Sequence, residues 1–177
     1  MRLFLLVTFV LAGPAFAAEP AQPDTALLRT ALVVSDVELS KRFYSKGLGY
    51  RIGFDGDITR PAVRQMLQLS DSQTAHFVVL RGADSIAGEP VSSAMLGLLK
   101  IAGPSVGDLD HDKDHSLKNG QVILAIVTAD IEAVYERLLM LDAEVLYAPT
   151  IAADGSEIEL VVNDPDGIRI HVVQSLR

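Results

Sequence analysis

The chain has 177 residues, a formal net charge of −8, 49% hydrophobic residues and no cysteine. This length suffices for one well-buried domain, or for two small modules that share a core. The negative charge, without a basic run anywhere, repels nucleic-acid phosphates and anionic lipid headgroups, so we expect neither as a partner. The lack of cysteine excludes disulfides and thiolate chemistry.

The first residues have the pattern of an export signal. Arg2 precedes an apolar run over residues 3–12, and a Gly-Pro pair separates that run from an A-x-A cleavage pattern at residues 15–17. The run is too short for a hydrocarbon core that needs roughly 20 residues. We predict a signal peptide at residues 1–18, a disordered leader at 19–26, and a periplasmic or secreted protein that leaves the membrane after cleavage.

The first half of the remaining chain predicts a β-α-β-β-β order. Apolar and β-branched residues at 27–34 predict a strand that leads directly into a helix, and this helix ends at Gly47. Residues 50–54 predict a second strand. Residues 63–69 and 75–80 predict a hairpin across a polar turn.

The second half predicts the same order again. Residues 122–128 predict a strand, and Asp130 starts a helix whose apolar residues recur at i, i+3, i+4 and i+7. Three more strands are predicted at residues 145–151, 157–162 and 168–174.

Two sequence matches support a duplication. Residues 33–38 open the first helix as residues 127–132 open the second, an offset of 127 − 33 = 94. His76 and His171 are related by nearly the same offset, 171 − 76 = 95, so we predict that they occupy matching positions. Solenoid arrays need three or more shorter repeats, so one repeat of this length predicts two fused modules.

Residues 81–120 fall outside the predicted repeat. Their apolar part at 91–102 predicts a helix that a Gly-Pro pair ends, and residues 107–120 predict a polar loop. The Asp/His tract at 110–115 has a metal-binding composition but no rigid scaffold, which favours a solvated loop.

The duplicated modules resemble the vicinal oxygen chelate superfamily, which includes glyoxalase I, extradiol dioxygenases and bleomycin-resistance proteins. The resemblance covers nearly all of the chain after the leader. The residues that carry it are Asp36, Phe43, Tyr44, Leu48 and Gly49 in the first module and Asp130, Asp164, Pro165, Asp166 and Gly167 in the second.

The resemblance implies an α+β fold in which two tandem βαβββ modules form a curled mixed sheet around a central cleft. We expect residues 27–177 to form a single domain. Within it we place module one at 27–80, the insert at 81–120 and module two at 121–177.

The resemblance also implies metal ligands on the first and last strands of each module. The first-strand positions hold Arg29 and Ile123, whereas the closing-strand position holds His171, with His76 as its expected counterpart. An arginine about 5 Å from a dication costs on the order of 6 kcal/mol at an effective dielectric of about 20, so we favour no metal and no other cofactor. If zinc, nickel, iron or manganese binds, its ligands are His76, His171 and Gln121, with water completing the shell.

The same residues predict a ligand site. Arg29 lies on an otherwise apolar strand, so it either closes a salt bridge inside the fold or holds an anionic group of a small molecule. Arg169 shares the face of His171 by strand alternation. We predict that Arg29, His76, Gln121, Arg169 and His171 bind a small-molecule ligand, and we assign no catalytic residue; histidines that only bond to neighbouring strands are the alternative.

Three hypotheses follow. In the first, an exported glyoxalase/bleomycin-resistance-like protein binds a small organic molecule, with an anionic one as an option, in the inter-module cleft without an essential metal. In the second, the chain is a metal-dependent enzyme, a glyoxalase I-like lyase or a dioxygenase. In the third, it is a structural or dimerising protein, and the insert at 81–120 contacts a second copy in a homodimer.

Overall fold

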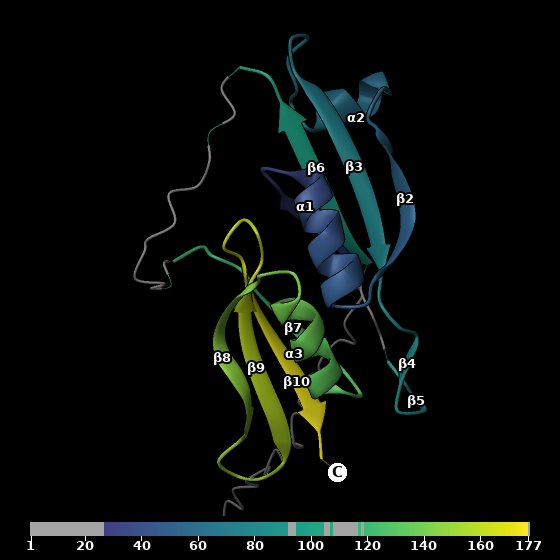
Figure 1. Cartoon of the computed structure of the whole chain (residues 1–177). Coiled ribbons are helices and arrows are strands. Elements are labelled where there is room, and N and C mark those ends of the chain that lie inside the picture. Colours follow the sequence, from purple (N-terminus) through teal and green to yellow (C-terminus); the bar gives the residue numbers. More distant parts are fainter. Residues whose placement is uncertain (1–26, 92–94, 105–106, 108–116, 118, 177) are drawn as a thin grey trace, which may run out of the picture.

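The structure, a computed structural model, describes residues 27–91, 95–104, 107, 117 and 119–176. These residues form two modules of the same topology (Figure 1). The predicted signal peptide, the leader and the Asp/His tract lie outside the described residues. Within the described part, no helix is long and apolar enough to cross a membrane.

The first module is a four-stranded mixed sheet with the order β1-β6-β3-β2, in which β1 and β6 are parallel and the other pairs are antiparallel. Its elements are β1 (Arg29–Val33), α1 (Val37–Arg42), the π-helical turn η1 (Phe43–Gly47), β2 (Arg51–Asp57), α2 (Pro61–Met66), β3 (Thr74–Arg81), the short pair β4 (Ser85–Ile86) and β5 (Glu89–Pro90), and β6 (Met95–Ala102).

The second module repeats this plan with the order β7-β10-β9-β8, and here β7 and β10 are the parallel pair. The repetition confirms the predicted α+β fold of tandem βαβββ modules. Its elements are β7 (Ile123–Val127), α3 (Ile131–Leu139), β8 (Glu144–Ile151), β9 (Glu157–Asn163) and β10 (Arg169–Ser175).

The predicted helix at 91–102 is wrong, because residues 95–102 form β6 between β1 and β3. The closing strand of the first module is therefore β6, so the module extends past residue 80. Four consecutive residues of β6, 96–99, are buried, and so short an apolar run has no periodicity that separates a strand from a helix. The hypothesis of dimerisation through this segment loses its contact helix, since β6 lies inside a sheet.

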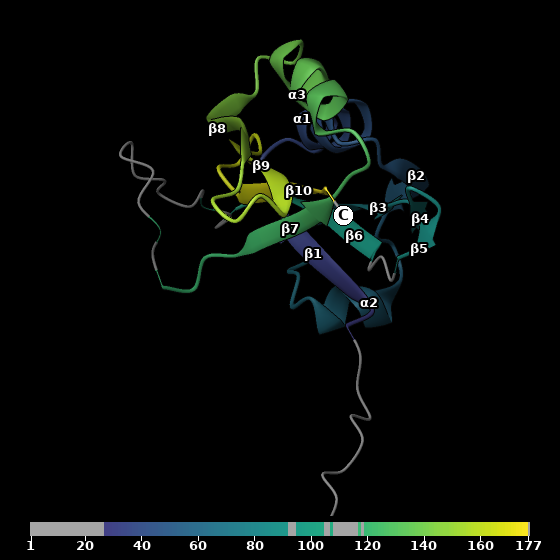
Figure 2. The same ribbon diagram turned by 90° about the horizontal axis from the view of Figure 1, so that it is seen from below.

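The predicted strand at 63–69 is also wrong. Residues 61–66 form α2, with Pro61 in the first turn, where proline's fixed φ favours a helix and its missing N–H costs no hydrogen bond. Seen from below, α2 lies on the side of the first sheet opposite to α1 (Figure 2).

Each sheet packs one face against a helix. In both modules an aspartate caps that helix: Asp36 accepts hydrogen bonds from two backbone N–H groups of α1, and Asp130 accepts one from α3. The core under the helices consists of alternate strand residues, all at most 5% exposed, such as Leu32, Val78, Leu80, Leu98, Leu160, Val162, Ile170 and Val172. On the opposite face of the first sheet lies only the short α2, which has no buried residue, and no described helix covers the opposite face of the second sheet.

The two modules meet where the turn between β9 and β10 contacts the first helix of module one. The buried Tyr44 hydroxyl donates a hydrogen bond to Asp164 Oδ2 at 2.8 Å. Asp164 Oδ1 also accepts from the backbone N–H groups of Asp166 and Ile168, at 3.0 and 2.8 Å. Burial raises the pKa of Asp164, although these bonds oppose the rise, and burial followed by the Asp164 charge raises the pKa of Tyr44.

A second carboxylate of the same turn extends the contact. Asp166 accepts from the backbone N–H of Ser35 at 2.9 Å and from the Ser40 hydroxyl at 3.4 Å. Nearby, Arg137 Nε donates to the carbonyl of Gly47 at 3.0 Å, and a Cβ at Gly47 would lie 2.9 Å from Leu138. The Asp-Pro-Asp-Gly turn therefore joins two modules as well as two strands.

We predict that Tyr44→Phe lowers the free energy of unfolding by about 1–3 kcal/mol, because it leaves a buried carboxylate with one hydrogen bond fewer. Urea denaturation would measure the change. Tyr50→Phe is the matched control, since the Tyr50 ring packs against Tyr44 without a hydroxyl partner among the described residues. Equal losses in both variants would contradict the predicted role of the Tyr44 hydroxyl.

Candidate functional site

His76 lies on the helix-covered face of the first sheet. It is two residues from Val78 and four from Leu80 on β3, so its side chain points to the same face as these buried residues. Its Nδ1 lies 2.7 Å from Asp57 Oδ1, and its Nε2 lies 2.6 Å from Asp55 Oδ1. The bond to Asp57 and then the bond to Asp55 raise the pKa of His76.

The Asp55 carboxylate links this group to the helix. Lys41 of α1 donates to Asp55 Oδ2 at 2.8 Å and to Glu38 Oε1 at 2.7 Å. The hydrogen bond from Lys41, and after it the bond from His76, lowers the pKa of Asp55. His76 is thus held in a structural network that ties α1 to β2 and β3.

His171 lies on the other kind of face. His171 stands between the fully buried Ile170 and Val172 on β10, and adjacent strand residues point to opposite faces. Its ring therefore points away from the helix that covers the second sheet. Its Nε2 lies 3.2 Å from Glu159 Oε1 on the neighbouring strand β9. Both side chains are about one-third exposed, at 32% and 31%.

The predicted equivalence of His76 and His171 is wrong. Ala31 of β1 pairs with Gly97, and Ala125 of β7, its counterpart by the offset of 94, pairs with His171, so the counterpart of His171 is Gly97 on β6. The offset was misleading because the closing strand of module one had been placed one strand too early, at β3 in place of β6.

Arg29 lies at the start of β1, on the face of the first sheet opposite to the core. Its guanidinium carbon is 5.0 Å from the centroid of the Phe77 ring. The ring fits above Gly97, where a Cβ would lie 2.7 Å from Phe77 Cζ. Among the described residues no carboxylate pairs with Arg29, so the predicted internal salt bridge does not form there.

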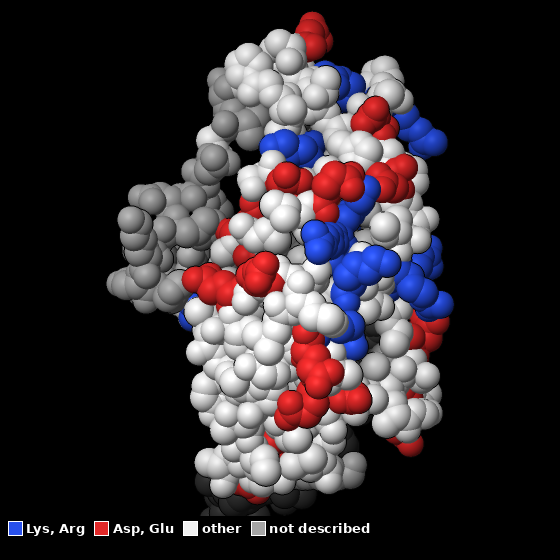
Figure 3. Space-filling view, in the orientation of Figure 1, with Lys and Arg blue, Asp and Glu red and all other residues white. Residues whose placement is uncertain are grey.

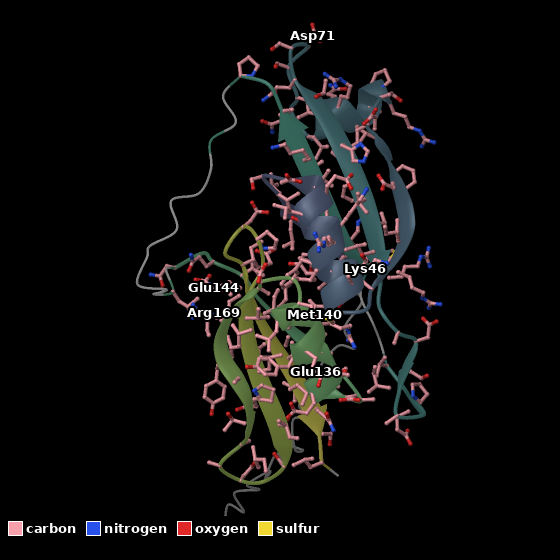
Figure 4. All side chains as sticks on the ribbon, viewed as in Figure 1. Lys46, Asp71, Glu136, Met140, Glu144 and Arg169 are labelled. Atoms are coloured by element: carbon pink, nitrogen blue, oxygen red, sulfur yellow. The ribbon has the colours of Figure 1, made fainter. Side chains whose placement is uncertain are left out.

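The other two predicted residues lie in module two. Arg169 starts β10 opposite Asn163, and Asn163 in turn lies opposite Glu144 and donates to its Oε2 at 2.8 Å. Figure 4 shows Arg169 and Glu144 at the same end of this sheet. Gln121 is exposed and precedes β7 by two residues.

These positions do not fit the metal site that the resemblance implies. With Gly97 as the counterpart of His171, three of the four implied ligand positions hold Arg29, Gly97 and Ile123, and only His171 carries a donor. The alternative set of His76, His171 and Gln121 fails as well, since the two histidines lie on opposite kinds of sheet face. No three His, Asp or Glu side chains gather at ligand spacing in the part of the chain that the structure describes.

A pocket of about 600 Å³ lies between the modules. Residues 122–128, which include the whole of the edge strand β7, line one side, and Leu27, Thr30, Met95 and Leu96 contribute from the first module. In the view of Figure 2 the ribbons of β1 and β7 overlap, and residues of both strands line the pocket. None of the five predicted ligand residues lines it, so the cleft itself is present but its walls differ from those predicted.

The duplication accounts for this pocket. The connector between β3 and β6 is the counterpart of the β9–β10 turn, and it contributes residues such as Ala83 and Ile86 to the pocket, as α3 contributes Val134. In one copy the Asp-Pro-Asp-Gly turn fills the space next to α1. In the other copy the connector, which carries β4 and β5, leaves a hollow next to α3.

The residues of module one that donate hydrogen bonds to the β9–β10 turn have no polar counterparts in module two. By the offset of 94, the counterparts of Ser35, Ser40 and Tyr44 are the apolar residues Ala129, Val134 and Leu138. No Asp, Glu, Lys, Arg or His lines the pocket among the described residues, whereas the surface over the helices carries many charges of both signs (Figure 3). The pocket therefore favours an apolar, uncharged molecular surface.

We predict that His76→Gln lowers the melting temperature more at about pH 6 than at about pH 9. A raised pKa means that protonated His76 stabilises the fold fully below its unfolded value of about 6.5, and that this stabilisation is lost as pH rises through the folded value. Because the group is partly exposed, the effect at the lower pH is at most about 1 kcal/mol. A loss that is equal at both pH values in thermal denaturation would contradict the network.

Comparison with known proteins supports the architecture. Residues 26–172 match the model of the Glyoxalase/Bleomycin resistance protein/Dioxygenase superfamily. No curated protein matches the chain.

Several solved structures share the fold. A glyoxalase family protein from Bacillus cereus matches with a TM-score of 0.69 and 17% identity, covering 89% of this chain and 100% of that one. Glyoxalase I from Leishmania major matches with a TM-score of 0.53 and 23% identity, covering 85% and 86%. Glyoxalase I from Zea mays matches with a TM-score of 0.53 and 15% identity, covering 85% of this chain and 47% of that one.

At these identities the structural likeness establishes the fold alone, whereas the family match spans both modules. The chain belongs to the Glyoxalase/Bleomycin resistance protein/Dioxygenase superfamily, the vicinal oxygen chelate group that its duplicated modules resemble.

Proposed function

We propose that this superfamily member binds a small organic molecule in the inter-module pocket and needs no metal to do so. The observation that carries the proposal is the pocket of about 600 Å³, which has walls from both modules and no charged lining side chain among the described residues. Its volume lies within the range of about 300–1,000 Å³ that small-molecule sites occupy. The export signal predicted at residues 1–18 supports the further proposal that this binding takes place in the periplasm or outside the cell.

The proposed mechanism of binding is burial of apolar surface. Removal of apolar area from water contributes roughly 25 cal/mol per Å², so a ligand gains most where its apolar part contacts the apolar side chains of the walls. The ligand would lie along β7, an edge strand with no strand neighbour on its outer side among the described strands. Backbone N–H and C=O groups of an edge strand provide hydrogen bonds that can orient a polar group of the ligand.

We predict that decanol, an uncharged apolar probe, binds with one molecule per chain, and that Ala83→Trp weakens the binding at least tenfold, a change of about 1.4 kcal/mol. The indole would occupy space at the connector wall of the pocket. Isothermal titration calorimetry would measure the affinity.

Ala153→Trp is the control, because Ala153 is also an exposed alanine and lies in a turn outside the pocket. Absence of decanol binding in the parent protein, or equal weakening in both variants, would overturn the proposed function.

The metal-dependent hypothesis predicts that the protein binds metal in a stoichiometric amount, and we predict the opposite. We expect the metal-to-protein ratio to stay near zero after dialysis against zinc, nickel, iron or manganese, because neither candidate ligand set offers three convergent donors. We also expect a chelator to leave decanol binding unchanged. Stoichiometric metal in elemental analysis that disappears in His171→Ala would contradict metal independence.

A further inference from the structure

Arg29 borders the inter-module pocket. Two of its sequence neighbours, Leu27 and Thr30, line the pocket, and so does Met95, its partner in the parallel register of β1 and β6. The backbone of Arg29 is therefore at the rim, although its side chain is not part of the wall. Arg29 is exposed, so its charged end is accessible from solvent.

The guanidinium of Arg29 is held in place by an aromatic ring. It lies over Phe77, with 5.0 Å between the guanidinium carbon and the ring centroid, and Gly97 leaves the space that this ring occupies. Stacking on a ring is favourable for a guanidinium and leaves the N–H groups along its edge free to donate. The stack thus holds a cation on the open face of the first sheet, on the strand next to Met95, which lines the pocket.

This cation is not neutralised within the described structure. No Asp or Glu pairs with Arg29 among the described residues, although acidic residues outnumber basic ones in the chain by 23 to 15. A planar guanidinium with five donors fits a carboxylate, which can accept two parallel hydrogen bonds from it. An anionic group is therefore the natural partner for this side chain.

We propose that the ligand of the pocket is an amphiphilic anion, whose apolar body lies along β7 and whose carboxylate or similar head binds Arg29 at the rim. The inference rests on the proposed function, because the apolar part of the ligand occupies the same inter-module pocket. An amphiphilic anion accounts for both observations: its apolar body suits the uncharged pocket wall, and its head suits the arginine on an otherwise apolar strand. Arg29 acts here as a specificity-determining residue for the ligand's head.

Three probes with the same apolar chain and different heads test this inference. Decanoate, decanol and decylamine are titrated into the protein at about pH 7.5, where the carboxylate is ionised and the amine is protonated. We expect decanoate to bind on the order of tenfold more tightly than decanol, because a hydrogen bond to a charged group adds to the same apolar burial. Decylamine should bind more weakly than decanol.

Two substitutions assign the preference to Arg29. Arg29→Gln should remove the advantage of decanoate over decanol, whereas Phe77→Leu should reduce that advantage because the guanidinium loses the ring on which it stacks. Arg60→Gln is the matched control, since Arg60 is exposed and does not border the pocket. It should preserve the full preference for decanoate.

The outcomes separate the two proposals. If neither decanol nor decanoate binds, the pocket is not the ligand site and the proposed function fails. If decanol binds but decanoate binds no more tightly, or if Arg29→Gln keeps the preference, the amphiphilic-anion inference alone is overturned.

Discussion

The hydrogen bond between the Tyr44 hydroxyl and the Asp164 carboxylate fixes how the two modules meet, and the rest of the structure depends on that arrangement. Both groups are buried, so any other docking of the modules that kept them buried would leave their polar atoms unpaired in an apolar surrounding. Asp166 accepts two further hydrogen bonds near the start of α1, from Ser35 and Ser40. These bonds fix the orientation of the β9–β10 turn relative to α1. A turn that reverses the chain therefore also positions the walls of the inter-module pocket.

The two halves of the duplication have diverged at this contact. One copy retains hydroxyl and backbone donors that receive a carboxylate-bearing turn, and the other presents Ala129, Val134 and Leu138 at the equivalent places. Because its connector does not fill the space, the second copy becomes a hollow in place of an interface. Arg29, Gly97 and Ile123 likewise offer no metal donor at three of the four ligand positions that the resemblance implies. Both features favour recognition of an organic ligand by apolar contact over metal chemistry.

The sequence contains enough to predict the duplication, the capped helices and the closing turn, because periodic apolar residues and an Asp-Pro-Asp-Gly turn are local signals. Strand β6 could not be predicted in this way, since its apolar run of residues 96–99 fits a helix and a strand equally well. If β3 is taken as the closing strand of module one in place of β6, the repeat is aligned one strand too early, and His76 is then matched falsely with His171. The role of Tyr44 was missed for another reason: its partner, Asp164, is 120 residues away, and local periodicity indicates only that the ring is buried.

We propose that the protein binds its ligand in the hollow beside α3 and not on the open sheet face around His171. The most direct measurement is a titration of the isotope-labelled protein with decanol, followed through its backbone amide chemical shifts. Binding in the hollow should produce saturable shifts in residues 122–128, which include β7, and at Met95, with little change at Ser35 or Glu159. Shifts confined to His171 and Glu159, with β7 unaffected, would contradict it.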